Sequence, residues 1–369
     1  MTYKELLLVA ICEKLQLQPR LYELAEERYH VIADTIEKAT AFNDTELRIY
    51  PQGSFRLKTT VKPLKGNEYD LDFVAELPKE AMMTPRQLYD RIYDILSTDG
   101  VHNDMVERKT RCIRVNYAND FHIDIMPGKA IDRATSEIVV PDRELDRWYH
   151  HSNPIGYAEW FENQARTHII STIFESRKIS ASAEPIEEQE ITARLEPLRR
   201  ATQLIKRYRD IYCDRYGAAP VRSIVLCTLM GQITSTYSGE LQILNDFCRY
   251  VKELAKSAQG KPFRVKNPVV NEILTEKWEE DPDIYKDFIT MISTLERDIQ
   301  ILENEISNAG IIAKLKAMFG ETVTNDAVKA QAEPISKARA VGSLAVGATG
   351  LLNTNKVGAT VVKNTFYGE

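Results

Sequence analysis

The feature that most constrains this chain is a pair of aspartates, Asp70 and Asp72, inside the strand-like run of residues 69–76, whose other side chains are mostly apolar. Side chains alternate between the two faces of a β-strand, so residues two apart lie on the same face. The two carboxylates would therefore lie side by side on a half-buried strand, which is costly unless a cation neutralises them. The pattern predicts a strand that carries a cation site.

We expect the cation to be Mg²⁺. This ion prefers one or two protein carboxylates, completed by water and by phosphate oxygens of a substrate. A second ion, which would activate an attacking hydroxyl roughly 4 Å from the first, needs a further carboxylate from a neighbouring strand. Asp124, in the strand-like run of residues 121–126, is the candidate. The sequence thus predicts a site for two Mg²⁺ ions, for which Mn²⁺ could substitute.

A Gly-Ser pair, Gly53 and Ser54, stands sixteen residues before the aspartates and follows a predicted amphipathic helix at residues 21–41. Such a turn can present backbone N–H groups and a hydroxyl to the β- and γ-phosphates of a nucleotide. Together with three carboxylates, it suits in-line attack of a hydroxyl on an α-phosphate, with pyrophosphate leaving.

Each of these motifs has an ordinary structural interpretation when it stands alone. An Asp-x-Asp pair usually marks an exposed strand edge or a turn, and a Gly-Ser pair is a common loop. Their conjunction, with Asp124 in a later strand of similar character, is more specific. His122 lies two residues before Asp124 and so faces the same side of its strand. A metal or base contact is conceivable for His122, but packing or a position at the rim of the site is the favoured interpretation.

The order of predicted elements indicates an α+β fold with two lobes, as the length of 369 residues also suggests. Strand-like runs are predicted at residues 69–76, 112–117 and 121–126, with a helix at 85–96. Helical patterns dominate after Pro154, at about residues 187–216, 221–237, 239–258 and 282–319. A lobe with a mixed sheet and helices is therefore expected to precede a helical lobe.

The expected division has three parts. Residues 1–170 form the catalytic lobe with its long N-terminal helix, and residues 171–321 form the helical lobe that completes the nucleotide pocket. From residue 322 to 369 the chain is rich in Ala, Gly, Val, Thr and Asn, with few aromatic or charged side chains. Such a composition gives little to fix against a core, so we expect a flexible tail there.

The bulk composition excludes several classes of protein. With 48 basic and 54 acidic side chains the formal net charge is -6, which argues against holding long nucleic acid through phosphate contacts. The five cysteines are scattered without a Cys-x-x-Cys pair, so neither a disulfide framework nor a zinc site is indicated, and a reducing cytoplasm fits best. Neither a signal peptide nor a membrane-spanning segment is expected.

At this point the motifs resemble a known family. The pattern is similar to the DNA polymerase β-type nucleotidyltransferase superfamily, and especially to the bacterial cyclic-oligonucleotide synthases called CD-NTases. The resemblance covers about residues 50–319 and is most specific in the first two hundred. It is carried by PQGS at residues 51–54, DLDFV at 70–74, HIDIMPG at 122–128, NPIGYAEWF at 153–161, QLIKRYRD at 203–210 and NPVVNEILTEKW at 267–278.

The resemblance implies a polymerase β-like catalytic lobe and three further nucleotide contacts. Lys206, on the first long helix of the second lobe, would reach the triphosphate, and Ser223, at the start of the next helix, would assist. Gln52 would also contact the nucleotide. A lysine charge and a hydroxyl at a helix N-terminus both suit a polyanion. Without the family, Lys206 would be taken for an exposed lysine in a basic cluster with Arg207 and Arg209.

The function that the resemblance implies is condensation of nucleoside triphosphates, ATP among them, into a cyclic di- or trinucleotide second messenger, in CBASS antiphage defence. Transfer of a nucleotide to an RNA end or a protein hydroxyl would use the same carboxylates, and a nucleotide-binding scaffold without catalysis is the alternative from another class. A regulatory or conjugating partner protein could act on the C-terminal tail. Conjugated relatives end in a small residue, whereas this chain ends in Glu369, so docking of a partner is the broader expectation.

Overall fold

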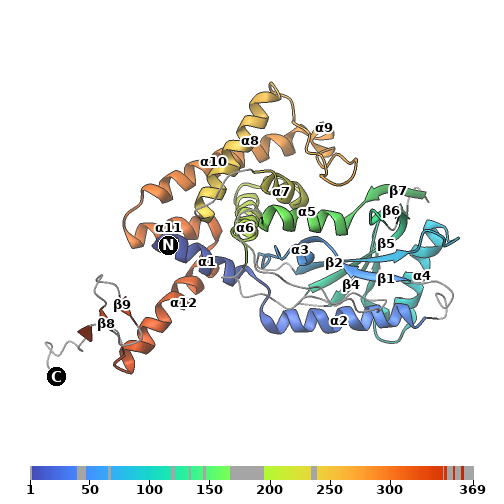
Figure 1. Ribbon diagram of the computed structural model, residues 1–369, viewed down its shortest axis with the longest axis horizontal. Coiled ribbons are helices and arrows are strands. Elements are labelled where there is room, and N and C mark those ends of the chain that lie inside the picture. The colour runs from blue at the N-terminus through green and yellow to red at the C-terminus, as the bar shows by residue number, and fades with distance from the viewer. Residues whose placement is uncertain are drawn as a thin grey trace.

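A computed structural model describes the chain in several ranges. These are residues 2–39, 47–64, 68–117, 121–132, 134–143, 147–166, 195–233 and 239–343, with three two-residue strands further on. A lobe that contains a β-sheet lies beside a lobe made of helices (Figure 1). The architecture is α+β with a mixed sheet followed by helices, which confirms the predicted fold class.

The first lobe is built on a seven-stranded sheet with the order β1-β2-β5-β4-β3, in which β6 pairs with β5 and β7 with β6. β2 and β5 are parallel, and the other pairs are antiparallel. The strands are β1 (Arg48–Pro51), β2 (Tyr69–Leu77), β3 (Val106–Arg108), β4 (Ile113–Tyr117), β5 (Phe121–Asp132), β6 (Glu137–Asp142) and β7 (Arg147–Ser152). The three predicted strands correspond to β2, β4 and β5.

The predicted end of the third strand at Pro127 was wrong, because β5 continues to Asp132. The strand continues because β5 changes its pairing partner on one side at this point. β4 pairs with β5 up to Ile125, and β6 pairs from Lys129 onward. Pro127 thus lies in the gap between these two ladders, where its missing N–H costs no hydrogen bond on that side.

Two amphipathic helices, α2 (Pro19–Glu37) and α4 (Pro85–Thr98), cover one face of this sheet. Buried side chains of α2 meet the sheet directly, and the ring of Tyr29 stacks on that of Phe73 with centroids 4.4 Å apart. α2 runs beneath the strands in Figure 1, on the side away from the helical lobe. The opposite face is free to carry the site, together with the one-turn helix α3 (Gly53–Arg56).

The helical lobe surrounds α6 (Pro197–Tyr216), which is buried along most of its length. Its other helices are α1 (Tyr3–Leu15), α5 (Pro154–Arg166), α7 (Ser223–Gly231), α8 (Glu240–Ser257), α9 (Lys277–Glu280), α10 (Pro282–Asn304), α11 (Asn308–Phe319) and α12 (Glu321–Ala340). The helix predicted at 282–319 is divided into α10 and α11, because Ser307 caps a new helix by accepting a hydrogen bond from the N–H of Gly310. Part of the helix predicted at 187–216 lies outside the described residues.

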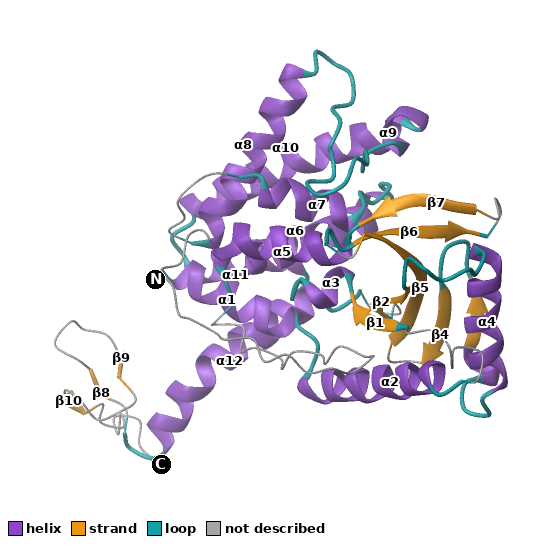
Figure 2. Cartoon of the chain, turned by 45° about the vertical axis from the view of Figure 1, so that its right-hand side comes forward, coloured by secondary structure: helices purple, strands orange, loops and turns teal. Residues whose placement is uncertain are grey.

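Two helices from the expected catalytic lobe belong to the helical core instead. Leu7, Leu8 and Ile11 of α1 and Phe161 of α5 are fully buried in the same cluster as α6, α7 and α8. A helix that is apolar around most of its circumference must be enclosed by other helices rather than lie on a sheet. The sequence therefore enters the helical lobe, leaves it to build the sheet, and returns through α5; Figure 2 shows α1 beside α11 and α12.

The tail predicted from residue 322 begins as a helix, which is a correction to the sequence-based expectation. α12 packs along α1, with Val323, Thr324 and Ala327 buried. Small side chains, which suggested mobility in the sequence, here allow a close approach to α1, and alanine is the best helix former. Beyond α12, three short strands pair with one another: β8 (Ala345–Val346), β9 (Leu352–Asn353) and β10 (Ala359–Thr360).

Among the described helices, none combines the length and the apolar character that crossing a bilayer requires.

The packing of α12 on α1 predicts that Ala327→Glu destabilises the protein. The substitution would bury a charge without a partner against α1, at a cost of roughly 2–4 kcal/mol. We expect a thermal unfolding midpoint at least about 4 °C below that of the native protein, measured by differential scanning fluorimetry. Lys329→Glu places the same side chain at an exposed position of α12 and should leave the midpoint within about 1 °C. Equal midpoints for the two variants would contradict the packing of this helix.

Candidate active site

The three predicted carboxylates meet because β2 and β5 are parallel neighbours in a fixed register. Asp72 is opposite Asp124, and Asp70 is opposite His122. Residues that pair across two strands project to the same face of a sheet, so these four side chains share the face that α2 and α4 leave uncovered. Asp124 is 9% exposed, whereas Asp70 is exposed to solvent.

The predicted Gly-Ser turn closes directly over Asp72. The N–H of Gln52 donates a hydrogen bond to the carbonyl of Asp72 over 2.8 Å, and Gly53 adopts the left-handed conformation with φ +60°. A Cβ atom at Gly53 would lie 2.4 Å from Oδ2 of Asp72. Both the backbone conformation and the close approach of the carboxylate therefore require glycine at this position.

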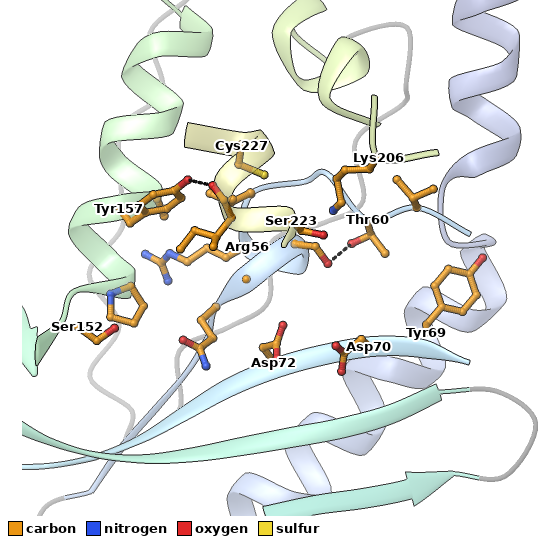
Figure 3. A pocket seen from close by; sticks show the side chains of 18 of the residues that line it. Arg56, Thr60, Tyr69, Asp70, Asp72, Ser152, Tyr157, Lys206, Ser223 and Cys227 are labelled. Carbon is orange, nitrogen blue, oxygen red and sulfur yellow. Dashed lines mark hydrogen bonds between the residues drawn. The ribbon is translucent and has the colours of Figure 1, made fainter. Parts of the chain in front are cut away.

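A cavity of about 480 Å³ separates the two lobes at this point. Asp70 and Asp72 line it from β2, while Lys206 and Ser223 reach into it from the helical lobe (Figure 3). The volume lies within the range usual for small-molecule sites. Of the predicted site residues, Gln52, Gly53, Ser54, Asp70, Asp72, Lys206 and Ser223 line this cavity, and Asp124 lies beside Asp72.

Asp124 is held by an arginine that the sequence analysis did not single out. Arg114 of β4 donates from Nε to Oδ1 of Asp124 over 2.7 Å and from Nη2 to Oδ2 over 2.6 Å. Its Nη2 also lies 3.8 Å from Oδ1 of Asp70. The antiparallel pairing of β4 with β5 sets Arg114 directly opposite Asp124. This fork of two parallel hydrogen bonds fixes the orientation of the carboxylate.

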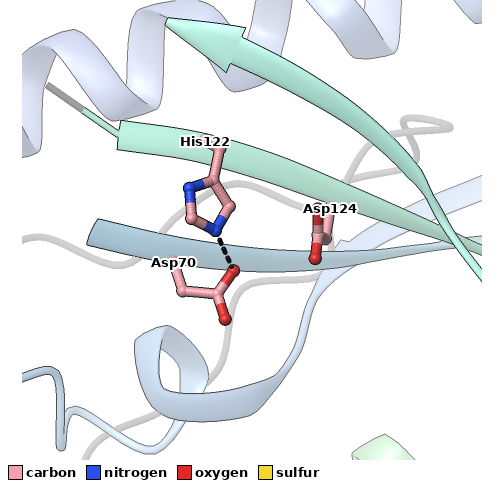
Figure 4. Close-up of side chains that lie close together, drawn as sticks. All are labelled: Asp70, His122 and Asp124. Carbon is pink, nitrogen blue, oxygen red and sulfur yellow. Dashed lines mark ion pairs between the residues drawn. The ribbon is translucent and has the colours of Figure 1, made fainter. Parts of the chain in front are cut away.

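His122 is also part of the cluster, and its contact with Asp70 adds to the interpretation of it as a packing or rim residue. Nε2 of His122 is 2.9 Å from Oδ1 of Asp70 (Figure 4). This hydrogen bond to Asp70 raises the pKa of the imidazole. One ligand atom each from Asp70, His122 and Asp124 lie within 4.8 Å of one another, so these three side chains could hold a metal ion.

Helix α6 binds the loop that follows the Gly-Ser turn through four of its side chains. Arg199 donates to the carbonyl of Leu57, Gln203 to Thr60 over 3.1 Å, Lys206 to Thr59 over 2.8 Å and Arg207 to Lys62 over 3.2 Å. The helical lobe therefore holds the loop through its backbone.

Lys206 is 5% exposed, so it is not the exposed lysine that its basic neighbours suggested. Burial lowers the pKa of its ammonium group. One of the three donors of Lys206 is used by the carbonyl of Thr59, over 2.8 Å. An anionic ligand in the cavity would offset the cost of burying this charge.

Ser223 is the first residue of α7 and is held in place by a second cation. Arg209 donates from Nη1 to Oγ of Ser223 and to the carbonyl of Val221, each over 2.9 Å.

On the opposite wall, the hydroxyl of Ser54 lies 3.4 Å from that of Thr60. Gln52 contacts Sδ of Met126 through Nε2 at 3.9 Å. The two walls of the cavity thus present hydroxyl groups and cationic side chains toward the aspartates.

The ionised form of Asp72 is disfavoured in this site. Withdrawal from water, then the charges of Asp70 and Asp124, raise the pKa of Asp72 to about 7, against the smaller opposing effects of His122 and Lys206. The nearby His122 and Lys206 therefore do not offset the cost of ionising Asp72. A hard divalent cation fits this set of oxygen donors, and Asp70, Asp72 and Asp124 would hold it.

This imbalance predicts that Asp72→Asn stabilises the metal-free protein. Because the folded-state pKa of Asp72 is raised, its carboxyl destabilises the fold increasingly as the pH rises toward about 7. In a buffer with a chelator, we expect a melting temperature roughly 2–4 °C above that of the native protein at pH 8, and a smaller gain at pH 5. A variant that melts at or below the native temperature at pH 8 would refute this balance of charges.

Comparison with known proteins agrees with the fold and the site. The family of the Second Messenger Oligonucleotide or Dinucleotide Synthetase domain matches residues 1–165. A c-di-GMP synthase of Roseivirga ehrenbergii is 32% identical over 340 residues, which are 89% of this chain and 87% of that protein.

Two solved structures share the fold. The CD-NTase CdnG of Bradyrhizobium diazoefficiens, in complex with GTP, has a TM-score of 0.71 and 24% identity and covers 89% of this chain and 99% of its own. DncV cyclic AMP-GMP synthase of Vibrio cholerae, in complex with a linear intermediate, has a TM-score of 0.58 and 16% identity, over 86% of this chain and 88% of its own. With a relative this similar along most of its length, the chain belongs to the CD-NTase family, the nucleotidyltransferases that make cyclic oligonucleotides.

Proposed function

We propose that this protein condenses two nucleoside triphosphates, at least one of them GTP, into a cyclic dinucleotide with release of pyrophosphate. The observation that carries the proposal is that Asp70 and Asp72 face Ser54 and Lys206 across one shared cavity. The choice of GTP is supported by the relative named a c-di-GMP synthase. Use of ATP, which the sequence analysis expected, stays a prediction.

Asp70, Asp72 and Asp124 would hold Mg²⁺, two ions in the full arrangement. When bound, Mg²⁺ neutralises phosphate charge and makes a ribose hydroxyl more nucleophilic. The protein contributes the positions of these carboxylates, which the β2–β5 register fixes before any ligand binds. Arg114 adds to this, because it holds both oxygens of Asp124 in one orientation.

The triphosphate would be bound between the two lobes. The backbone at Gly53 and the hydroxyls of Ser54 and Ser223 offer hydrogen bonds to its oxygens, and Lys206 offers its charge. In each of two rounds, a ribose hydroxyl gives up its proton to water and its oxygen forms a bond to an α-phosphorus, while the bond from that phosphorus to the bridging oxygen of pyrophosphate breaks. The second round closes the ring.

The biological setting is also part of the proposal. A role in CBASS antiphage defence and a partner protein that acts on the C-terminal segment are supported by the family resemblance alone, and a cytoplasmic location is supported by the scattered cysteines. The end of that segment, residues 361–369 with Glu369, lies outside the described residues.

The proposal predicts a phosphatase-resistant product from labelled triphosphates and Mg²⁺. Each of the four triphosphates is supplied alone and in pairs, and products are separated by chromatography and weighed by mass spectrometry. We expect a cyclic dinucleotide whenever GTP is present, and none from Asp70→Asn or Asp72→Asn. Label transferred to added RNA or protein instead of a small product, or unchanged activity in these variants, would refute the assignment.

The fit of Gly53 against Asp72 predicts that Gly53→Ala lowers the initial rate of pyrophosphate release at least roughly 100-fold. The added Cβ would meet Oδ2 of Asp72 and displace either the turn or the carboxylate. Gly100→Ala is the matched control, because Gly100 also has positive φ, of +80°, but nothing lies within 4 Å of its Cβ position. Loss of activity in both variants would indicate general backbone strain rather than the contact with Asp72.

A further inference from the structure

We propose that His122 is a metal ligand, and that Asp70, His122 and Asp124 form one cation position that takes Mn²⁺ in preference to Mg²⁺. This inference rests on the proposed function for the presence of a divalent cation. It goes beyond that function because it adds a nitrogen ligand to the three carboxylates and thereby selects the ion.

The first support is the spacing of the ligand atoms. Neighbouring ligands on an octahedral ion with bonds of about 2.1 Å lie roughly 3.0 Å apart. Nε2 of His122 and Oδ1 of Asp70 are 2.9 Å apart, so they already have the separation of two ligands on a shared edge. The nearest Asp124 oxygen completes a set within 4.8 Å.

The second support is the orientation of the imidazole. Its Nε2 is directed toward Asp70, on the side of the cluster (Figure 4). Its other nitrogen, Nδ1, lies 3.8 Å from Oε2 of Glu68. An ion bound at Nε2 would displace the proton that Nε2 donates to Asp70, and the proton left on Nδ1 would face the carboxylate of Glu68.

The third support is the state of Asp124. Arg114 bonds to both of its oxygens, so one lone pair on each is occupied and its charge is partly neutralised. Asp124 therefore binds a cation at this position less strongly than a carboxylate without these hydrogen bonds would. The imidazole of His122 supplies the ligand that completes the position.

The nitrogen ligand determines the choice of ion. Mg²⁺ is hard and prefers oxygen ligands, whereas Mn²⁺ keeps octahedral coordination and also accepts imidazole. Of the three proposed ligands Asp70 also lines the cavity, where water and phosphate oxygens suit either ion. This cation position should therefore distinguish Mn²⁺ from Mg²⁺ through the His122 ligand alone.

The test compares the native full-length protein with His122→Gln. The glutamine Nε2 reaches Asp70 much as the imidazole Nε2 does and keeps the hydrogen bond, but it is a poor ligand for Mn²⁺. Binding of Mn²⁺ and of Mg²⁺ is measured by titration calorimetry. We expect the variant to lose at least roughly tenfold in affinity for Mn²⁺ and less than threefold for Mg²⁺. Equal losses for the two ions, or none, would overturn the proposal.

A spectroscopic arm reports the ligand directly. Pulsed electron paramagnetic resonance of bound Mn²⁺ should show ¹⁴N coupling from an imidazole in the native protein and none in His122→Gln. His151→Gln is the control, since His151 is on β7 and pairs with Glu137; it should keep the coupling. Absence of ¹⁴N coupling in the native protein overturns the proposal. These measurements involve no turnover, so a protein that binds Mn²⁺ as described but makes no cyclic product would refute the proposed function only.

Discussion

The parallel pairing of β2 with β5 is the interaction on which the site depends. It brings a local Asp-x-Asp motif beside residues that lie more than fifty positions later, with Asp72 opposite Asp124. A slip by one residue would turn Asp124 to the face that α2 and α4 cover, because side chains alternate along a strand. Buried Leu71, Phe73 and Ile123 on that face hold the register. The apolar core therefore determines where the charges meet.

The sequence predicted those parts of the site that follow from local periodicity. Asp70 and Asp72 share a face in any strand, and Gly53 with Ser54 could be recognised as a turn. Arg114 was missed because its role arises from antiparallel pairing with β5, which periodicity within one strand does not reveal. His122 was correctly placed on the face of Asp124, but its contact with Asp70 depends on the neighbouring strand. The roles of the cavity residues still stand as predictions.

The fold, like the site, could be predicted where it depends on local sequence patterns and not where it depends on contacts between distant segments. The fold class and the main strands of the first lobe follow from patterning, whereas the place of a helix follows from its partners. α1 and α12 are far apart in the sequence and pack against each other, so neither composition alone could assign them. The helical lobe in turn holds the turn region through α6, whose side chains bind backbone carbonyls of residues 57–62 rather than side chains. Such contacts tolerate substitution in the loop but not in the helix.

The position of α1 has a consequence for synthesis on the ribosome. Among the described helices α1 emerges before the others, but the helices that enclose Leu7, Leu8 and Ile11 follow some two hundred residues or more later, up to α12. The sheet and its covering helices α2 and α4 are complete much earlier, by about residue 152. During translation the apolar surface of α1 therefore stays without its packing partners while the sheet is nearly complete. The cavity gains its second wall only after that, so a nascent chain would hold its aspartates together well before it could close around a triphosphate.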